Sequence, residues 1–184
     1  MTAPLWIFAY GSLIFRPDFP FVERRRASAR DHARRFHQGS PDHRGTPDHL
    51  GRVVTLVAAT GARCEGLAYR VEDEHRDAVL ALLDRREQGG YQRSALTIRF
   101  DDEVTPSLAS TAEATTWIAR ADNPWWLGDE PEEAIVARMQ RAHGPSGANR
   151  DYVLRLRAAL RELSILDDHV EAIADALVAS PRGA

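Results

Sequence analysis

The sequence contains no lysine, and all 24 of its basic residues are arginines. A pyridoxal-phosphate Schiff base, a lysine-based aldolase and a phosphate-binding P-loop each require a lysine amine, so these three kinds of site are excluded. Cysteine is nearly absent as well, because the chain has only Cys64. A single cysteine cannot form an intramolecular disulfide, and we therefore expect a reducing, cytoplasmic location.

Long hydrophobic runs are also missing. No stretch approaches the ~20 apolar residues of a membrane span, and the first residues lack the apolar region of a signal peptide. The 184 residues are 43% hydrophobic and 28% charged, which is typical of a soluble globular protein. A net charge of −3 gives no reason to expect nucleic acid or a membrane as a partner. We interpret 1–184 as one domain and expect 179–184 to be a frayed tail.

The hydrophobic pattern predicts strands first, one helix among them, and helices at the end. Alternating or β-branched runs predict strands over 5–10, 52–57, 64–71, 91–100 and 113–119, with a turn near residue 61. Helices are predicted over about 73–86, 131–142, 149–163 and 167–178. This order favours an α+β fold with a mixed or antiparallel sheet that is closed or strongly curved.

Several residues have predicted places in the helices. We expect Asp73 and Asn149 to act as N-caps, and Pro131 to occupy the first helical position. The first helix is expected to bury Val79, Leu82 and Leu83 and to end at Gly89-Gly90.

The tetrapeptide Tyr10-Gly11-Ser12-Leu13 directly follows the first predicted strand. A buried strand that opens into a Gly-Ser turn presents consecutive backbone N–H groups, which can cradle a carboxylate or a phosphate. In this interpretation Gly11 supplies an unusual φ and a close approach to the ligand, and Ser12 adds a hydroxyl donor. A plain strand–turn junction explains the same residues adequately, so the tetrapeptide alone is a weak signal.

Glu87 follows two arginines and precedes a pair of glycines, a pattern that is typical of a helix C-terminus. A carboxylate fits that position badly, because the helix dipole disfavours negative charge there. The dipole and partial burial would raise the pKa of Glu87 and make it a better base near neutral pH. Arg85 and Arg86 would lower the same pKa, and the sequence leaves the balance between these effects open.

Two other constellations fit known chemistry poorly. Four histidines lie within 18 residues, but their spacing matches no zinc motif, and loop histidines are usually solvated or structural. They are His32, His37, His43 and His49. The segment GPSGA at 144–148 is one residue short of a nucleophile elbow and lacks the strand that should precede it. We therefore expect neither a metal site nor a serine nucleophile, and we expect Trp125 and Trp126 to anchor a loop.

Seven segments occur in a fixed order along the chain. They are FAYGSLI (8–14), RFHQGS (35–40), DHRG (42–45), GRVVTL (51–56), LDRREQGGY (83–91), DNP (122–124) and GPSGAN (144–149). No single segment is decisive, but together they are highly specific. From about Trp6 to Leu163 the chain resembles the ChaC-type, glutathione-specific γ-glutamylcyclotransferases.

The resemblance implies a small mixed β-barrel-like core flanked by helices. It implies an enzyme that cleaves glutathione to 5-oxoproline and cysteinylglycine without a metal or an organic cofactor. It gives Glu87 the role of catalytic acid and base, and it gives the grip on the γ-glutamyl group to Ala9, Tyr10, Gly11, Ser12, Leu13 and Ile14. The chain departs from the family at Ala9, where glycine is common, and at Gln88, where lysine is common. Neither departure changes the expected chemistry.

Further residues are expected to contact the substrate. Tyr91 and Tyr152 are candidates for hydrogen bonds to it, and Arg44 and Arg52 could neutralise its carboxylates or be purely structural. The expected partner is a small γ-glutamyl peptide, and the oligomeric state stays open, as does closure of the 41–50 loop over the ligand.

Two alternatives remain for the function. The first is a cyclotransferase for other γ-glutamyl amines or amino acids. The second is a non-catalytic module that binds γ-glutamyl groups. Retention of Glu87 argues against the second, because an uncompensated carboxylate hinders the binding of an anionic ligand.

Overall fold

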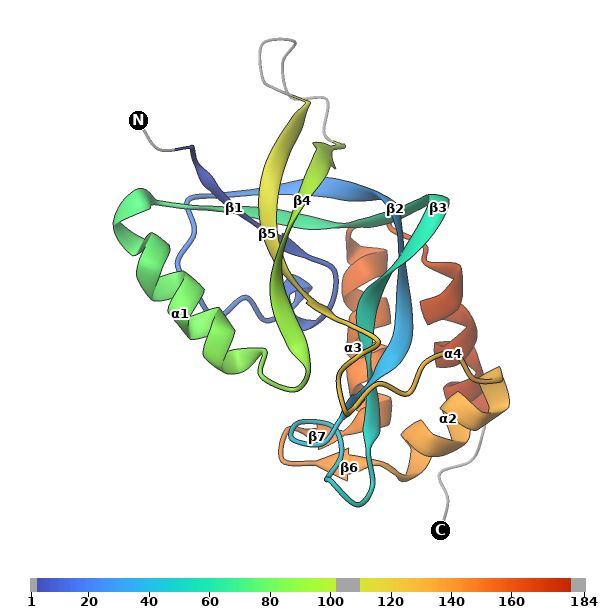
Figure 1. The fold of residues 1–184 in the computed structure, drawn as a ribbon. Helices are drawn as coiled ribbons and strands as arrows, with labels where there is room; N and C mark the ends of the chain where they lie inside the picture. Colours follow the sequence, from blue (N-terminus) through green and yellow to red (C-terminus); the bar gives the residue numbers. More distant parts are fainter. Residues whose placement is uncertain (1–2, 102–109, 180–184) are drawn as a thin grey trace.

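The computed structural model describes residues 3–101 and 110–179. Its strands form a closed barrel in the order β1–β3–β2–β4–β5 (Figure 1). Their bounds are Leu5–Ala9 for β1, Glu23–Ser40 for β2, Gly51–Val71 for β3, Tyr91–Phe100 for β4 and Thr111–Ala119 for β5. The pairing of β1 with β5 is parallel and the other pairings are antiparallel. The predicted α+β fold with a closed mixed sheet is confirmed.

The hairpin of β2 and β3 is the largest departure from the sequence prediction. β2 has 18 residues and was not predicted, and β3 has 21 residues in one piece. The expected turn at Gly61 is instead an irregularity inside β3, where the pairing shifts between Arg30 and His32. Gly61 has a φ of +80° there, and its N–H donates to Asp31 Oδ1 at 2.8 Å.

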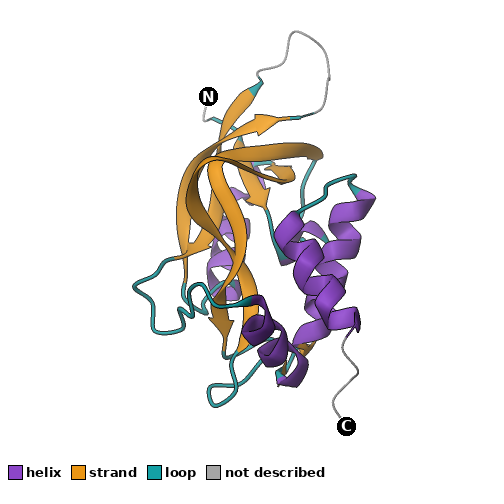
Figure 2. Cartoon of the chain, turned by 90° about the vertical axis from the view of Figure 1, so that its right-hand side faces the viewer, coloured by secondary structure: helices purple, strands orange, loops and turns teal. Residues whose placement is uncertain are grey.

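The helices lie in two places around the barrel (Figures 1 and 2). α1 (Arg76–Arg86) follows the short 3₁₀ turn η2 (Asp73–His75) on one side. On the other side α3 (Asn149–Glu162) packs against α4 (Asp168–Ala179), and α2 (Glu132–Arg141) packs against both. None of these helices combines the length and the apolar character that crossing a bilayer requires.

Some helix details differ from the predictions. Val79 and Leu83 are buried, but Leu82 is exposed, so its predicted place in the core is wrong. Glu72 occupies the N-cap position of η2 and Ala148 that of α3, so neither Asp73 nor Asn149 has its predicted position, and Pro131 precedes the first helical residue of α2. Of the predicted tail, residue 179 still belongs to α4, and 180–184 lie outside the described residues.

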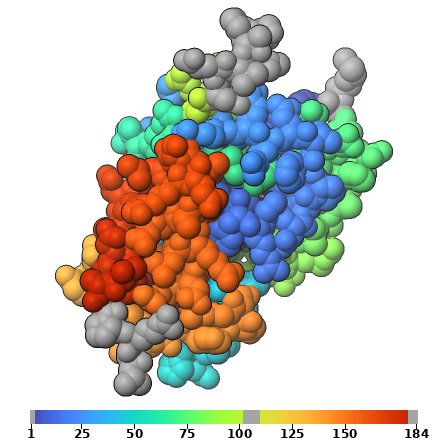
Figure 3. All heavy atoms as spheres, turned by 180° about the vertical axis from the view of Figure 1, so that it is seen from behind, coloured from blue at the N-terminus to red at the C-terminus, as the bar shows by residue number. Residues whose placement is uncertain are grey.

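The N-terminal segment joins the barrel to the helical layer. β1 is buried along its whole length, and the single 3₁₀ turn η1 (Ser12–Ile14) follows it. η1 lies against α3, with the rings of Phe15 and Tyr152 6.4 Å apart. Figure 3 shows this blue segment beside the orange residues of α3 on the surface. The end of β1 therefore lies where barrel, loops and helices meet.

Candidate active site

A cavity of about 250 Å³ lies at this junction. Its wall combines segments that are far apart in the sequence: the end of β1 with η1, the loop after β2, the start of β3, the end of α1 and the start of α3. Its polar and charged lining includes Tyr10, Ser12, Arg16, Asp18, Asp42, His43, Arg44, Arg86, Glu87, Tyr91, Ser146 and Tyr152. The turn after the first strand and the end of the first helix, which are 75 residues apart in the sequence, therefore line the same cavity.

Most of the predicted site residues line this cavity. Tyr10, Gly11, Ser12, Leu13, Glu87, Tyr91 and Tyr152 are all part of its wall. Ala9 and Ile14 are not: both side chains are buried, Ala9 at the end of β1 and Ile14 at the end of η1. Ala9 and Ile14, the first and last residues of the predicted loop, are therefore buried next to the cavity wall and are not part of it.

The backbone after β1 has the form that the cradle interpretation requires. Among the described residues, the N–H groups of Ser12 and Leu13 donate no hydrogen bond, as is usual for the first residues of a helical turn. The φ of Gly11 is −126°, so the unusual φ that we expected is absent. Space is limited here instead, because a β-carbon would lie 3.0 Å from Cγ2 of Val54, which is a tight contact.

Glu87 is the C-cap residue of α1, and it lines the cavity. Its backbone N–H donates to the Leu83 carbonyl at 2.9 Å, and its side chain is 18% exposed. Burial raises the pKa of Glu87 above its usual value, although the positive charge of Arg86 and the neighbouring His43 ring lower it. Burial thus decides the balance that the sequence left open, and Arg85 is exposed.

Arg86 connects this carboxylate to the cradle. Its Nε lies 3.4 Å from Glu87 Oε1, and its Nη2 donates to Ser12 Oγ at 3.1 Å. Nη1 donates to the Arg16 carbonyl at 2.8 Å. One guanidinium therefore bridges the end of α1 and the segment after β1, which holds the acidic group beside the free N–H groups.

An amide pair, the buried Gln38 and the half-buried Asn123, supports the turn after Glu87. Gln38 Nε2 donates to the Gly89 carbonyl at 2.7 Å, and the side chains of Gln38 and Asn123 bond to each other at 2.9 and 3.2 Å. Gly90 has a φ of +92°, and a β-carbon there would lie 2.4 Å from Asn123 Oδ1. The RFHQGS and DNP segments thus support the turn that carries the acidic residue, a role that sequence reasoning missed.

The GPSGAN segment supports the loop after β2. Together with His143 it forms a two-stranded sheet of β6 (His143–Gly144) and β7 (Gly147–Ala148). Ser146 N–H donates to the His43 carbonyl at 2.9 Å, and Ser146 Oγ lies 3.1 Å from His43 Nδ1. The other nitrogen of His43 is 3.9 Å from Asp42, too far for a hydrogen bond, so these residues do not form a nucleophilic triad. The segment stabilises the loop rather than supplying a nucleophile.

The three tyrosines of the wall offer different hydrogen-bonding groups. The hydroxyls of Tyr10 and Tyr91 donate to the carbonyls of Trp117 and Val54, each at 2.5 Å, so both are left with lone pairs. The Tyr152 hydroxyl accepts a long 3.5 Å contact from Val54 N–H, which leaves its proton free to be donated. Burial raises the pKa of Tyr152 to about 12 and raises those of the other two. All three are therefore neutral near pH 7.

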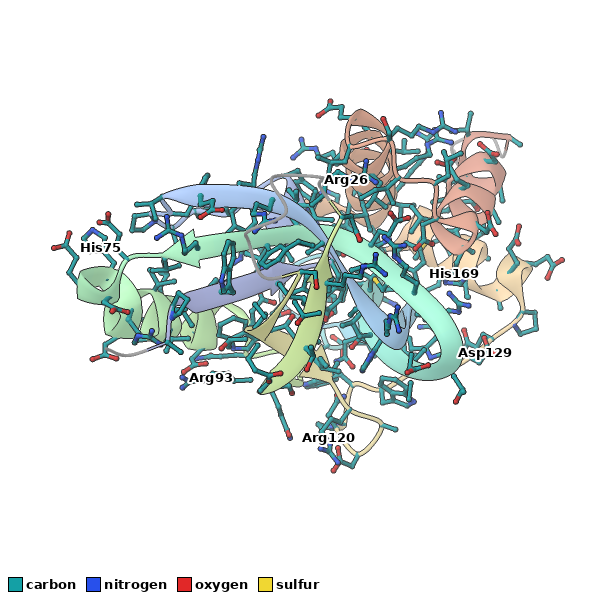
Figure 4. All side chains as sticks on the ribbon, turned by 90° about the horizontal axis from the view of Figure 1, so that it is seen from above. Arg26, His75, Arg93, Arg120, Asp129 and His169 are labelled. Carbon is teal, nitrogen blue, oxygen red and sulfur yellow. The ribbon has the colours of Figure 1, made fainter. Side chains whose placement is uncertain are left out.

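The candidate histidines do not converge on one point. His43 alone of the four lines the cavity, and His37 packs edge-on against Trp126. Among the described residues, the group that could hold a metal ion is Glu72, Glu74 and His75, all of them exposed. Figure 4 shows His75 at the outer end of α1, far from His169 and Asp129. This exposed group has no link to the cavity.

The two candidate arginines have different places. Arg52 is fully buried and does not line the cavity; it donates to the Phe36 and Gly128 carbonyls and lies 2.6 Å from Glu130. Arg44 does line the cavity. Arg52 is therefore structural, and only Arg44 remains as a candidate for contact with a ligand.

Comparison with known proteins gives a consistent result. The family model of the ChaC-like protein matches residues 5–180. Gamma-glutamylcyclotransferase 2-3 of Arabidopsis thaliana is 42% identical over 93% of this chain and 87% of its own. Glutathione-specific gamma-glutamylcyclotransferase 1 of Mus musculus is 40% identical over 94% of this chain and 78% of its own.

The fold comparison points the same way. The crystal structure of a selenomethionine-labelled γ-glutamylcyclotransferase specific to glutathione, from yeast, superimposes with a TM-score of 0.88. The two proteins are 25% identical, and the match covers 96% of each chain. With a family model that spans nearly its whole length, a shared barrel and relatives at about two-fifths identity, this chain belongs to the ChaC-like family.

Proposed function

We propose that this protein is a glutathione-specific γ-glutamylcyclotransferase that releases 5-oxoproline and cysteinylglycine. One observation carries the proposal: Glu87, with its raised pKa, lines the same cavity as Ser12 and Leu13, whose N–H groups donate no hydrogen bond among the described residues. An acid–base group and an anion cradle are the two parts that the cyclisation needs. The names of the relatives support the substrate, since those from mouse and yeast are specific to glutathione.

The reaction needs one group that first accepts and then donates a proton. The α-amine of the γ-glutamyl group is mostly an ammonium at neutral pH and must lose a proton before it can attack. Glu87 takes this proton, the amine nitrogen bonds to the γ-carbonyl carbon, and the bond from that carbon to the cysteinyl nitrogen breaks. Glu87 then returns this proton to the departing nitrogen, removes the surplus proton that remains on the lactam nitrogen and passes it to the released amine, which leaves as an ammonium. A single carboxyl group therefore completes the cycle.

The cavity contributes mainly by orientation. Nucleophile and electrophile belong to the same molecule, so folding the substrate into the attack geometry supplies several kcal/mol, by the measured scale of such effects. The N–H groups of Ser12 and Leu13 hold the α-carboxylate, and donors of this kind also stabilise a developing oxyanion. The Tyr152 hydroxyl can donate to the substrate, and those of Tyr10 and Tyr91 can accept from it.

A substrate panel tests the proposal. Purified protein is incubated with reduced glutathione, with a γ-glutamyl amino acid and with a γ-glutamyl amine, and 5-oxoproline and the released amine are measured. We expect product from glutathione, with much less from the other two, and no change on addition of a chelator. Preference for a γ-glutamyl amine would favour the other cyclotransferase function, and binding without product would favour the non-catalytic module. The cytoplasmic location stays a prediction.

The pH profile gives a second prediction. Catalysis requires ionised Glu87, so kcat/KM falls as the pH drops through its pKa, which burial places above the usual value. Arg86→Gln removes the charge that lowers this pKa, so the acid limb is expected to move to higher pH. Arg85→Gln is the matched control, because Arg85 is exposed. An acid limb at the same pH in the parent and Arg86→Gln proteins would contradict the assignment of this limb to Glu87.

A further inference from the structure

Arg44 is a buried cation in the wall of the cavity. It is 8% exposed, and its guanidinium carbon lies 5.5 Å from the centroid of the Tyr152 ring. Its Nη1 donates to the Ser146 carbonyl at 2.5 Å, and its backbone N–H donates to Ser40 Oγ at 3.0 Å. Hydrogen bonds therefore hold both the backbone and the side chain of Arg44 in place. The rest of the guanidinium has no hydrogen-bond partner among the described residues.

The charge of Arg44 is unmatched, unlike those of the two other arginines in the wall. Arg16 lies 2.6 Å from Asp18, and Arg86 lies 3.4 Å from Glu87. In the described part of the chain, no carboxylate lies within ion-pair distance of Arg44. A buried charge without a partner is costly, so the arrangement is best explained by an anion that arrives with the ligand.

The charges of the substrate indicate which anion this is. Glutathione has one ammonium and two carboxylates. In the proposed reaction, Glu87 takes the ammonium proton, and the N–H groups of Ser12 and Leu13 hold the α-carboxylate. The glycine carboxylate is then the one substrate charge without an assigned partner. Arg44 is the one arginine of the cavity wall without a carboxylate partner among the described residues.

The positions agree with an extended peptide. Tyr152 lies between the two groups: its ring faces Arg44, and its hydroxyl lies 3.6 Å from the place of a β-carbon on Gly11. A tripeptide in an extended conformation spans about 10 Å, enough to run along a tyrosine side chain from the cradle to the guanidinium. We propose that Arg44 binds the C-terminal carboxylate of the peptide substrate and so selects peptides over γ-glutamyl amines. This inference rests on the proposed function.

The test changes the enzyme and the substrate together. The parent, Arg44→Gln and Arg44→Lys proteins are assayed with glutathione and with its glycine amide, which lacks the carboxylate. On glutathione we expect Arg44→Gln to lower kcat/KM roughly ten- to a hundredfold, mainly through KM, the scale of a lost charge-assisted hydrogen bond. On the amide, parent and variant should agree within about threefold, and Arg44→Lys should recover part of the loss on glutathione.

Arg16→Gln is the control, because Arg16 lines the same cavity but is paired with Asp18. If Arg44→Gln loses the same factor on both substrates, or if the parent uses the amide as well as glutathione, the inference is wrong. If Arg44→Gln does not fold, the comparison of the two substrates on the parent protein decides.

Calorimetric binding of both ligands to the parent protein separates the two proposals. Discrimination against the amide without any 5-oxoproline would leave the role of Arg44 intact and contradict the proposed function. Formation of 5-oxoproline without discrimination between glutathione and its amide would support the proposed function and contradict the role of Arg44.

Discussion

Replacing Glu87 with glutamine is expected to reduce kcat on glutathione by about 10²- to 10⁴-fold, the range for a lost acid–base group. Glutamine has nearly the same shape and can still hydrogen bond, but it cannot accept the proton of the substrate ammonium. The N–H groups of Ser12 and Leu13 remain in place, so KM is expected to change much less than kcat.

The same substitution should leave the fold at least as stable. Burial raises the pKa of Glu87 in the folded protein above its value in the unfolded chain. The folded state therefore binds more protons in the pH interval between the two pKa values, and its stability falls as the pH rises through that interval. Above that interval the ionised carboxylate thus destabilises the fold, and neutral glutamine removes this effect.

Activity and thermal unfolding are measured on the same preparations. Glu74→Gln is the control, because its side chain is 73% exposed and lies at the outer end of α1, away from the cavity. A large loss of kcat in Glu87→Gln without a lower Tm is the expected pair of results. Comparable rates for Glu87→Gln and the parent would exclude Glu87 as the acid–base group.

Strands with regular pairing were predicted well from the sequence, and strands with irregular pairing were not. β4 alternates buried and exposed residues, with Leu96, Ile98 and Phe100 inward, and its bounds match the prediction. β2 contains two register shifts and many arginines, so its apolar residues do not alternate over any useful length. Its pairing with β3 and β4 makes it a strand, and a local pattern cannot report such pairing.

The site was predictable only where a residue's role is local. The Gly-Ser opening after β1 and the misplaced carboxylate at the end of α1 are both visible in the sequence, and both proved to line one cavity. Arg44 and Arg52 looked equivalent in the sequence. They differ because Glu130 lies 2.6 Å from Arg52, whereas Arg44 has no such partner among the described residues, and only the fold determines these distances.

The second large effect concerns stability and the position of the cradle. Arg34 is fully buried and connects three elements: its Nε donates to the Tyr10 carbonyl at 2.6 Å, its Nη2 to the Glu65 carbonyl at 2.5 Å, and its Nη1 to Asp167 at 2.6 Å. Arg34→Met keeps much of the volume but leaves a carboxylate with 15% exposure and two carbonyls without their donor. Breaking a buried ion pair in this way destabilises a protein by about 3–5 kcal/mol.

For a chain of this size, such a loss corresponds to a Tm lower by roughly 10 °C, which scanning calorimetry measures directly. Activity is expected to fall as well, because the Tyr10 carbonyl anchors the residue that precedes the cradle. The double variant Arg34→Met, Asp167→Asn separates the two causes of instability. Asparagine preserves the cap that Asp167 forms with Val170 N–H at 3.1 Å, but it carries no charge.

If the unpaired carboxylate is the main cause, the double variant is more stable than Arg34→Met alone, and the two substitutions are not additive. If the lost carbonyl contacts dominate, adding Asp167→Asn gives no recovery. A loss of less than about 1 kcal/mol in Arg34→Met would contradict both explanations, because a typical single hydrogen bond alone contributes that much. In that case β1, β3 and α4 would be held together by their apolar contacts, and the position of the cradle would not depend on the buried arginine.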